Sequence, residues 1–152
     1  MNTTYQMRKA PLTARAKLSI TRPFTSLWFA AALLDCSKYQ LIEYIENGDI
    51  PLAFDIAVPG AHRACLRVAT ADLLQLSVGR TPNGDLARLF DLVLPKNRPV
   101  YRPAQLAWLL HCDYDHIYHL LRANILADAG GRTRYQVPRD SIIAFLTERR
   151  VM

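Results

Sequence analysis

Three histidines and one cysteine that could bind zinc stand close together in the C-terminal third of the chain. They are His111, Cys112, His116 and His119, and imidazole nitrogens and thiolates are the usual zinc ligands. A helix would place His116 and His119, three positions apart, on one face. An earlier segment of similar pattern has a corresponding cysteine, Cys36, with no histidine near it, so we interpret the shared cysteine as a small buried turn residue. The sequence therefore predicts no metal site and no cofactor.

The sequence also lacks the residue patterns of common enzyme sites. It has no glycine-rich phosphate loop, no Gly-x-Ser-x-Gly nucleophile elbow and no clustered carboxylate pair in a loop. Its acidic residues are scattered over expected helices, where exposure to solvent explains them. We therefore predict that the chain is not an enzyme. His116 and His119, which lie on one expected helix, become candidates to donate hydrogen bonds to phosphates or bases instead.

Composition and charge set the broad class. The chain has 152 residues, of which 51% are hydrophobic and 21% charged, so we expect a packed core in one ordinary domain or two small ones. Nineteen basic residues against thirteen acidic ones give a net charge of +6, which favours polyanionic partners weakly. No apolar run approaches the roughly 18 residues of a membrane span. Three widely spaced cysteines and no secretory segment predict a cytoplasmic location.

The segment from Arg102 to Arg150 has the pattern of a small winged helix. Two short helical patterns, separated by a tight turn near Asp113, predict a helix-turn-helix. Extended runs on either side of residues 129–132 predict a two-stranded wing. Residues 138–140 then begin a third helix, whose apolar side is formed by Ile142, Ile143, Phe145 and Leu146.

The same pattern occurs earlier in the chain, at an offset of 76 positions. Ala31, Leu33, Leu34 and Cys36 then correspond to Ala107, Leu109, Leu110 and Cys112. We expect wing strands at residues 54–57 and 64–68, and a helix from residue 71 to about 78 with its cap at Ala69-Thr70. Trp28 and Trp108 are interpreted as core or interface residues. An internal repeat of this kind is a fold-level signal.

The C-terminal segment resembles a known family. The run Gly131-Arg132-Thr133-Arg134-Tyr135-Gln136-Val137-Pro138-Arg139-Asp140, followed by residues 142–146, is similar to the excisionase-like, MerR-type helix-turn-helix DNA-binding domains. In that family, a basic wing strand returns into a helix capped by proline. The resemblance covers about fifty residues and implies a module that binds double-stranded DNA, as a transcriptional regulator or an excisionase-like accessory factor.

These observations predict a mainly α chain with small β wings, an α+β class, built as two tandem winged helix-turn-helix domains. The expected segments are a basic arm at residues 1–24, a first domain at 25–79, a linker with a short helix at 80–100, and a second domain at 101–152. A second helix of each repeat would enter the major groove. The expected DNA-binding residues are Lys38, Tyr39, Gln40, Arg63, Arg67, Tyr114, His116, His119, Arg122, Arg132 and Arg134.

Charge separates the two repeats. Residues 25–79 carry a net charge of −3, whereas residues 101–152 carry +2 and the arm +5. Asp115 and Glu43 stand where the family more often has cations, and carboxylates there repel phosphates. The second repeat is therefore the better expected DNA binder. The alternative is a protein–protein adaptor that keeps the winged-helix fold and uses the acidic first repeat for self-association or for a protein partner.

Overall fold

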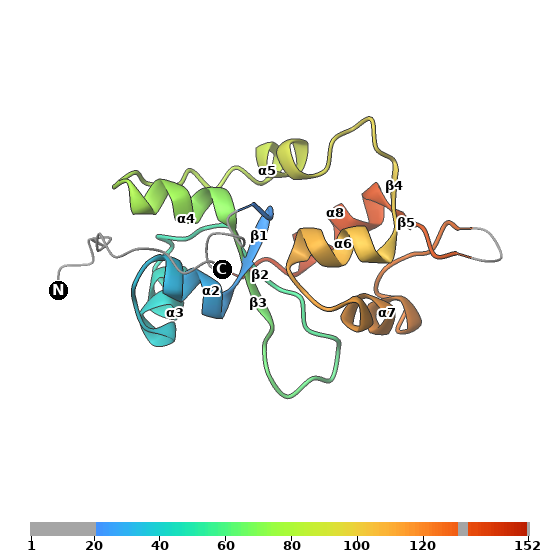
Figure 1. The fold of residues 1–152 in the computed structure, drawn as a ribbon, viewed down its shortest axis with the longest axis horizontal. Coiled ribbons are helices and arrows are strands. Elements are labelled where there is room, and N and C mark those ends of the chain that lie inside the picture. Colours follow the sequence, from blue (N-terminus) through green and yellow to red (C-terminus); the bar gives the residue numbers. More distant parts are fainter. Residues whose placement is uncertain (1–20, 131–133, 152) are drawn as a thin grey trace.

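The computed structural model describes residues 21–130 and 134–151. This part of the chain has a mixed α+β fold with two small antiparallel sheets, as expected for the α+β class (Figure 1). None of its helices has the length and apolarity that a membrane span requires. Most of the expected basic arm, at residues 1–20, lies outside the described residues, and so does Arg132.

From residue 21 on, the first half of the chain contains a three-stranded sheet and three helices. In chain order the elements are β1 (Phe24–Ser26), α2 (Leu27–Leu33), α3 (Lys38–Glu46), β2 (Ala53–Asp55), β3 (Leu66–Ala69) and α4 (Thr70–Ser77). Strand β3 lies between β1 and β2 and is antiparallel to both. Residues 24–77 are called the first repeat below.

The second half has the same order of elements with one strand fewer among the described residues. The elements are β4 (Val100–Tyr101), α6 (Pro103–Leu110), α7 (Tyr114–Arg122), β5 (Val137–Pro138) and α8 (Arg139–Glu148). Strands β4 and β5 are antiparallel, with Tyr101 opposite Val137. Residues 100–148 are called the second repeat. Its Ile142, Phe145 and Leu146 are buried, as expected, whereas Ile143 is only half-buried.

Backbone geometry relates the two repeats. Helices α3 and α7 begin and end 76 positions apart. The turns before them contain Asp35 and His111, also 76 apart, with left-handed φ values of 49° and 55°. The turns after them contain Gly48 and Asn124, again 76 apart, with φ values of 83° and 58°. Since non-glycine residues seldom adopt positive φ, matching values at matching positions show that both helix pairs have the same local fold.

The offset shortens after the second helix of each pair. Helices α4 and α8 begin 69 positions apart, because the connection from α7 to β5 is shorter than that from α3 to β3. In both repeats the first residue of the last helix donates its backbone hydrogen bond to a proline before the first strand: Thr70 to Pro23 at 3.0 Å, and Arg139 to Pro99 at 2.8 Å. The repeat therefore begins at these prolines.

The third helix of the first repeat begins one residue earlier than expected, and Thr70 does not cap it. The Thr70 hydroxyl instead donates to the Arg22 carbonyl oxygen at 2.6 Å and lies 2.7 Å from the Thr25 hydroxyl. Thr25 lies in β1 and Arg22 just before it, more than forty positions earlier in the chain. Local sequence therefore did not indicate them. The strands also lie one or two residues from their expected bounds, at residues 53–55 and 66–69.

Trp28 and Trp108 were expected to be core or interface residues. Neither is a core residue, so the first of these interpretations is wrong. Trp28 is 67% exposed and Trp108 is 49% exposed. The inward positions of α2 are occupied by Ala30, Ala31 and Leu33, which leaves Trp28 on the outer face. On α6, Leu106, Ala107, Leu109 and Leu110 face inward, so Trp108 faces outward for the same reason.

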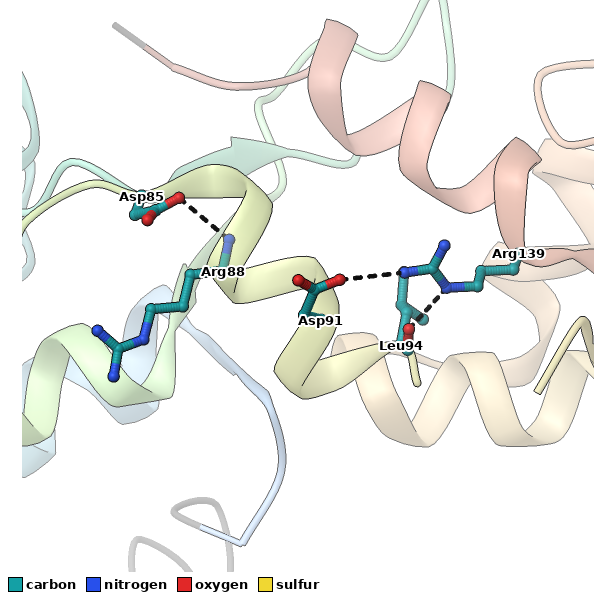
Figure 2. Close-up of polar contacts among 5 residues, drawn as sticks. All are labelled: Asp85, Arg88, Asp91, Leu94 and Arg139. Carbon is teal, nitrogen blue, oxygen red and sulfur yellow. Dashed lines mark hydrogen bonds and ion pairs between the residues drawn. The ribbon is translucent and has the colours of Figure 1, made fainter. Parts of the chain in front are cut away.

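Helix α5 (Leu86–Val93) connects the repeats and packs within the chain. Its Leu89 and Phe90 are buried, and the Asp85 side chain caps its N-terminus by accepting from the Arg88 backbone at 3.1 Å. Arg139, at the start of α8, contacts the C-terminal end of α5 (Figure 2). Its Nε donates to the Leu94 carbonyl oxygen at 2.6 Å, and its guanidinium lies 3.8 Å from Asp91.

The repeats share a hydrophobic cluster. Phe24 and Phe54 of the first repeat pack in one cluster with Phe90 of α5 and with Leu110 and Phe145 of the second repeat. A second cluster is formed by buried side chains of the first repeat alone. Apolar contact of this kind stabilises a fold by about 25 cal/mol per Å² of buried surface. The larger cluster therefore holds the two repeats together.

The chain after α8 returns to the first repeat and extends its sheet. The Asp55 backbone donates to the Arg149 carbonyl oxygen at 2.9 Å, and the Val151 backbone donates to that of Ala53 at 2.8 Å. Phe54 and Arg150 form an antiparallel bridge between these bonds. The edge of β2 is thereby paired, which removes an exposed strand edge.

Candidate nucleic-acid interface

Helix α3 exposes the residues expected to contact DNA. Lys38, Tyr39 and Gln40 are exposed in its first turn, with Tyr39 79% exposed, whereas Leu41 and Ile45 are buried. Tyr44, which was expected to be internal, is only half-buried. The helix begins with a capping box, in which Ser37 accepts from the Gln40 backbone at 3.1 Å and the Gln40 side-chain oxygen accepts from the Ser37 backbone at 2.9 Å. Gln40 must release this cap before its amide can form two hydrogen bonds with adenine.

Helix α7 exposes a comparable set on the second repeat. Tyr114, His119 and Arg122 are exposed, and Ile117, Leu120 and Leu121 are buried, as the helical spacing predicted. Asp115 is exposed in the first turn. The helix dipole stabilises a carboxylate at this end of the helix, but the same carboxylate repels phosphate. The exposed face of α7 therefore carries one permanent cation, Arg122, at its C-terminal end.

Three tyrosines connect α7 to the chain just before β5. The Tyr114 hydroxyl donates to the Tyr118 hydroxyl at 2.8 Å, and the Tyr118 ring meets the Tyr135 ring edge-on at 5.2 Å. Arg122 lies 5.8 Å from the Tyr118 ring. The spacing of Tyr114 and Tyr118 indicates their contact in a helix, but no spacing connects Tyr135 to them. The ring contact holds Tyr135 against α7.

His116 is directed towards the first repeat. Its Nε2 lies 2.6 Å from the carbonyl oxygen of Ile56, which follows β2, and the side chain is half-buried. A carbonyl oxygen only accepts, so His116 carries its proton on Nε2 and donates it. The contact joins the first turn of α7 to the start of the 56–65 loop.

Arg67 makes a second contact between the repeats. Its Nε donates to the carbonyl oxygens of Leu110 and His111, at 2.9 and 3.0 Å, and its Nη1 donates to the Leu66 carbonyl oxygen at 2.8 Å. Leu110 is the last residue of α6 and His111 follows it. A guanidinium at this place satisfies carbonyls that lack helical partners and opposes the negative end of the helix dipole.

His111 completes the junction. Its Nδ1 accepts from the Ser26 backbone at 3.3 Å, and its ring stacks on Phe29 with centroids 4.9 Å apart. Burial, together with the nearby guanidinium groups of Arg22 and Arg67, lowers the pKa of His111 from 6.5 to about 4. The ring is therefore neutral at pH 7 and acts as a hydrogen-bond acceptor.

The loop at residues 56–65 projects between α3 and α7 at one edge of the molecule, opposite the edge formed by α4 and α5 (Figure 1). Arg63 is exposed in this loop. The Asp55 carboxylate closes the loop by accepting from the Ala57 and Cys65 backbones at 3.0 and 2.9 Å. Asp128 does the same in the second repeat, accepting from the Gly130 and Gln136 backbones at 2.8 and 2.9 Å.

Arg134, which follows residues 131–133 of that second loop in the sequence, is exposed. Of the two arginines expected on the second wing, Arg134 lies among the described residues and Arg132 does not. Of the expected contact residues, Lys38, Tyr39, Gln40, Arg63, Tyr114, His119 and Arg122 are also exposed, whereas Arg67 and His116 contact the other repeat.

The four candidate metal ligands do not converge. Within residues 21–130 and 134–151, no group of three or more histidine, cysteine, aspartate or glutamate side chains is placed to hold a metal ion. Burial raises the pKa of Cys112 to about 12 and that of Cys36 to about 11, so both remain thiols at pH 7. They occupy corresponding turns, donating backbone hydrogen bonds of 3.0 Å to Ala107 and Ala31.

Comparison of the chain with protein-family models, with curated proteins and with solved structures gave no match.

Proposed function

We propose that the protein binds double-stranded DNA through two tandem winged helices, with α3 and α7 as the helices that enter the major groove. One observation carries this proposal: two helices of the same local fold, 76 positions apart, lie along one edge of the molecule with an exposed loop between them (Figure 1). A helix is narrow enough to enter the major groove, where the edges of the base pairs differ in their donors and acceptors.

Both helices belong to one rigid unit in this proposal. The shared hydrophobic cluster and the contacts of Arg67, His111 and His116 join the two repeats, and α3 packs into the first repeat through the second cluster. A rigid pair reads two half-sites at a single spacing, whereas a flexible tether would accept a range of spacings. The expected DNA site therefore has two unlike half-sites separated by a fixed number of base pairs.

The exposed residues divide into two roles. Lys38, Arg63, Arg122 and Arg134 are the cations that we assign to phosphate or guanine contacts, and Tyr39, Gln40, Tyr114 and His119 supply further polar contacts. Arg67 and His116 are positioning residues, because their polar atoms are occupied within the chain. Arg132 and residues 1–20 remain expected phosphate contacts that lie outside the described residues.

The test is selection of bound sequences from random duplexes, followed by titration of the selected duplex at two salt concentrations. We expect a two-part motif with one spacing, and a loss of about 0.9 from the salt slope for each phosphate contact removed. Lys38→Gln and Arg122→Gln should each weaken binding. Arg88→Gln on α5, at the opposite edge, should not. If no duplex is bound at low salt, the proposal is wrong.

A second candidate function is a protein–protein adaptor that uses the first repeat. Trp28 is 67% exposed and Tyr39 is 79% exposed, and aromatic residues of this kind are enriched at protein interfaces. The net charge of −3 on residues 25–79 also favours a protein over DNA as partner. The variant Trp28→Ala, at a position outside the assigned DNA contacts, separates the two functions when self-association is measured by sedimentation beside DNA binding. Loss of self-association with DNA binding retained would assign this surface to protein contacts.

A further inference from the structure

An open groove lies on the outer face of α6. Its volume is about 410 Å³, at the lower end of the range for small-molecule sites. It is bounded by α6, by the chain between α5 and β4, and by the residue before β1. The lining residues are Pro23, Val93, Pro95, Arg98, Tyr101, Ala104, Gln105, Trp108 and Leu109. Its walls are mostly apolar. The Trp108 indole forms one of them and is half-exposed to solvent.

The charged side chain among the lining residues is a cation, Arg98. Between Asp91 and Asp113 the chain contains Lys96, Arg98 and Arg102 but no carboxylate. Asp91 itself lies 3.8 Å from the Arg139 guanidinium, which balances it. The Arg98 guanidinium lies over the Tyr101 ring, 4.9 Å from its centroid. A cation at the mouth of an apolar groove favours an anionic ligand.

Comparison of the two repeats shows a donor without an acceptor at this place. In the first repeat the Thr25 hydroxyl is paired with that of Thr70 at 2.7 Å. Tyr101 occupies the position of Thr25 in the second repeat, and Arg139 that of Thr70, so the hydroxyl pair of the first repeat has no counterpart there. Arg139 donates to Leu94, but the buried Tyr101 hydroxyl has no hydrogen-bond partner among the described residues. An unpaired buried hydroxyl destabilises the fold, because it has lost its hydrogen bonds to water.

We propose that this groove binds a small organic carboxylate with an apolar body, such as an arylalkanoate. The apolar body lies between Trp108, Pro95 and Pro23. The carboxylate accepts a hydrogen bond from the Arg98 guanidinium. After a small shift of the Arg98 side chain, it also accepts one from the Tyr101 hydroxyl. Both donors gain an acceptor, and the apolar walls are covered. This site is separate from α3 and α7, and its existence does not depend on DNA binding.

The test uses the fluorescence of Trp108, which becomes the only tryptophan in a Trp28→Phe background. Three probes are titrated: 3-phenylpropanoate, the neutral 3-phenylpropan-1-ol with the same apolar body, and inorganic phosphate. We expect saturable binding of 3-phenylpropanoate at millimolar or lower concentration, and much weaker responses to the other two. Equal affinity for the alcohol would overturn the charge assignment. Equal affinity for phosphate would overturn the apolar site, and no saturable response to 3-phenylpropanoate would overturn the proposal.

Variants assign the contacts. Arg98→Gln should weaken 3-phenylpropanoate binding by about tenfold, the effect of one charge-assisted hydrogen bond, whereas Arg88→Gln on the outside of α5 should leave it unchanged. Ala104→Trp should fill the groove and abolish binding. Tyr101→Phe should weaken binding without lowering the urea midpoint, because the lost hydroxyl has no partner among the described residues. Undiminished binding by both Arg98→Gln and Ala104→Trp would place the ligand elsewhere and overturn the proposal.

Discussion

The Nε of Arg67 lies 3.0 Å from the carbonyl oxygen of His111. This hydrogen bond crosses from the first repeat to the turn that separates α6 from α7. The His111 side chain makes the return contact, since its Nδ1 accepts from the Ser26 backbone and its ring stacks on Phe29. The turn that sets the angle between α6 and α7 is therefore held by side chains and backbone of the first repeat.

Arg67→Ala should lower the free energy of unfolding by about 1–2 kcal/mol, because a charged donor to two helix-terminal carbonyls is lost. Urea denaturation followed by circular dichroism measures the change. Arg63→Ala is the matched control, since it removes the same charge from an exposed loop and should change stability by less than about 0.5 kcal/mol. Equal effects of the two substitutions would contradict the role given to Arg67.

Two buried titratable groups should make opposite contributions to the pH dependence of stability. Burial raises the pKa of Asp72 from 3.8 to about 6, although its hydrogen bond from Leu52 and the nearby Arg150 act in the other direction. The folded state then binds the proton more tightly than the unfolded state. The stability contributed by Asp72 is complete below pH 3.8 and is lost as pH rises through about 6.

For His111 the sign is reversed. Its pKa falls from 6.5 to about 4 on folding, through burial and the nearby Arg22 and Arg67. Its contribution is present above pH 6.5 and is lost as pH falls towards about 4. Asp72→Asn should therefore give a protein whose stability rises more steeply with pH over this interval than that of the parent chain. His111→Asn, which tolerates the positive φ, should give one whose stability falls more steeply. Parallel curves for all three proteins would show that neither group titrates differently on folding.

Val151→Pro should destabilise the protein by removing the N–H that donates to the Ala53 carbonyl oxygen at 2.8 Å. Loss of that bond leaves a strand carbonyl unpaired, at an expected cost of about 1–2 kcal/mol. Val151→Ala keeps the N–H and shortens the side chain, so the difference between the two urea midpoints isolates the hydrogen bond. No difference would mean that residues 149–151 add little to the sheet.

Gly84→Ala and Gly79→Ala form a matched pair. Both glycines have left-handed φ, +72° and +77°, so alanine should cost about 1 kcal/mol at either position. A Cβ at position 84 would also lie 3.0 Å from Pro51 Cβ, whereas nothing lies within 4 Å of one at position 79. Gly84→Ala should therefore be the more destabilising by thermal denaturation. The reverse order would show that the chain at Gly84 moves away from Pro51 without cost.

The sequence by itself determined the helix pairs and their relation. Apolar side chains such as Ile117 and Leu41 recur at helical spacing, and burial of one face follows from that spacing. The offset of 76 between α3 and α7 could be read from residue types in the same way. Cys36 and Cys112, in the turns before α3 and α7, could be matched from residue types at the same offset. Exposure of Lys38 and Arg122 followed from their places opposite these apolar faces.

Only the tertiary structure decided what Arg67, His111 and His116 do. Their hydrogen-bond partners in the other repeat lie 43 to 85 positions away in the chain, and no spacing rule connects a side chain to a backbone group at that distance. The sequence predicted Arg67 and His116 as polar groups available to DNA, because polarity is local information. Which polar atom meets which acceptor depends on how the two repeats pack through their shared cluster, and that packing directs all three side chains to the junction.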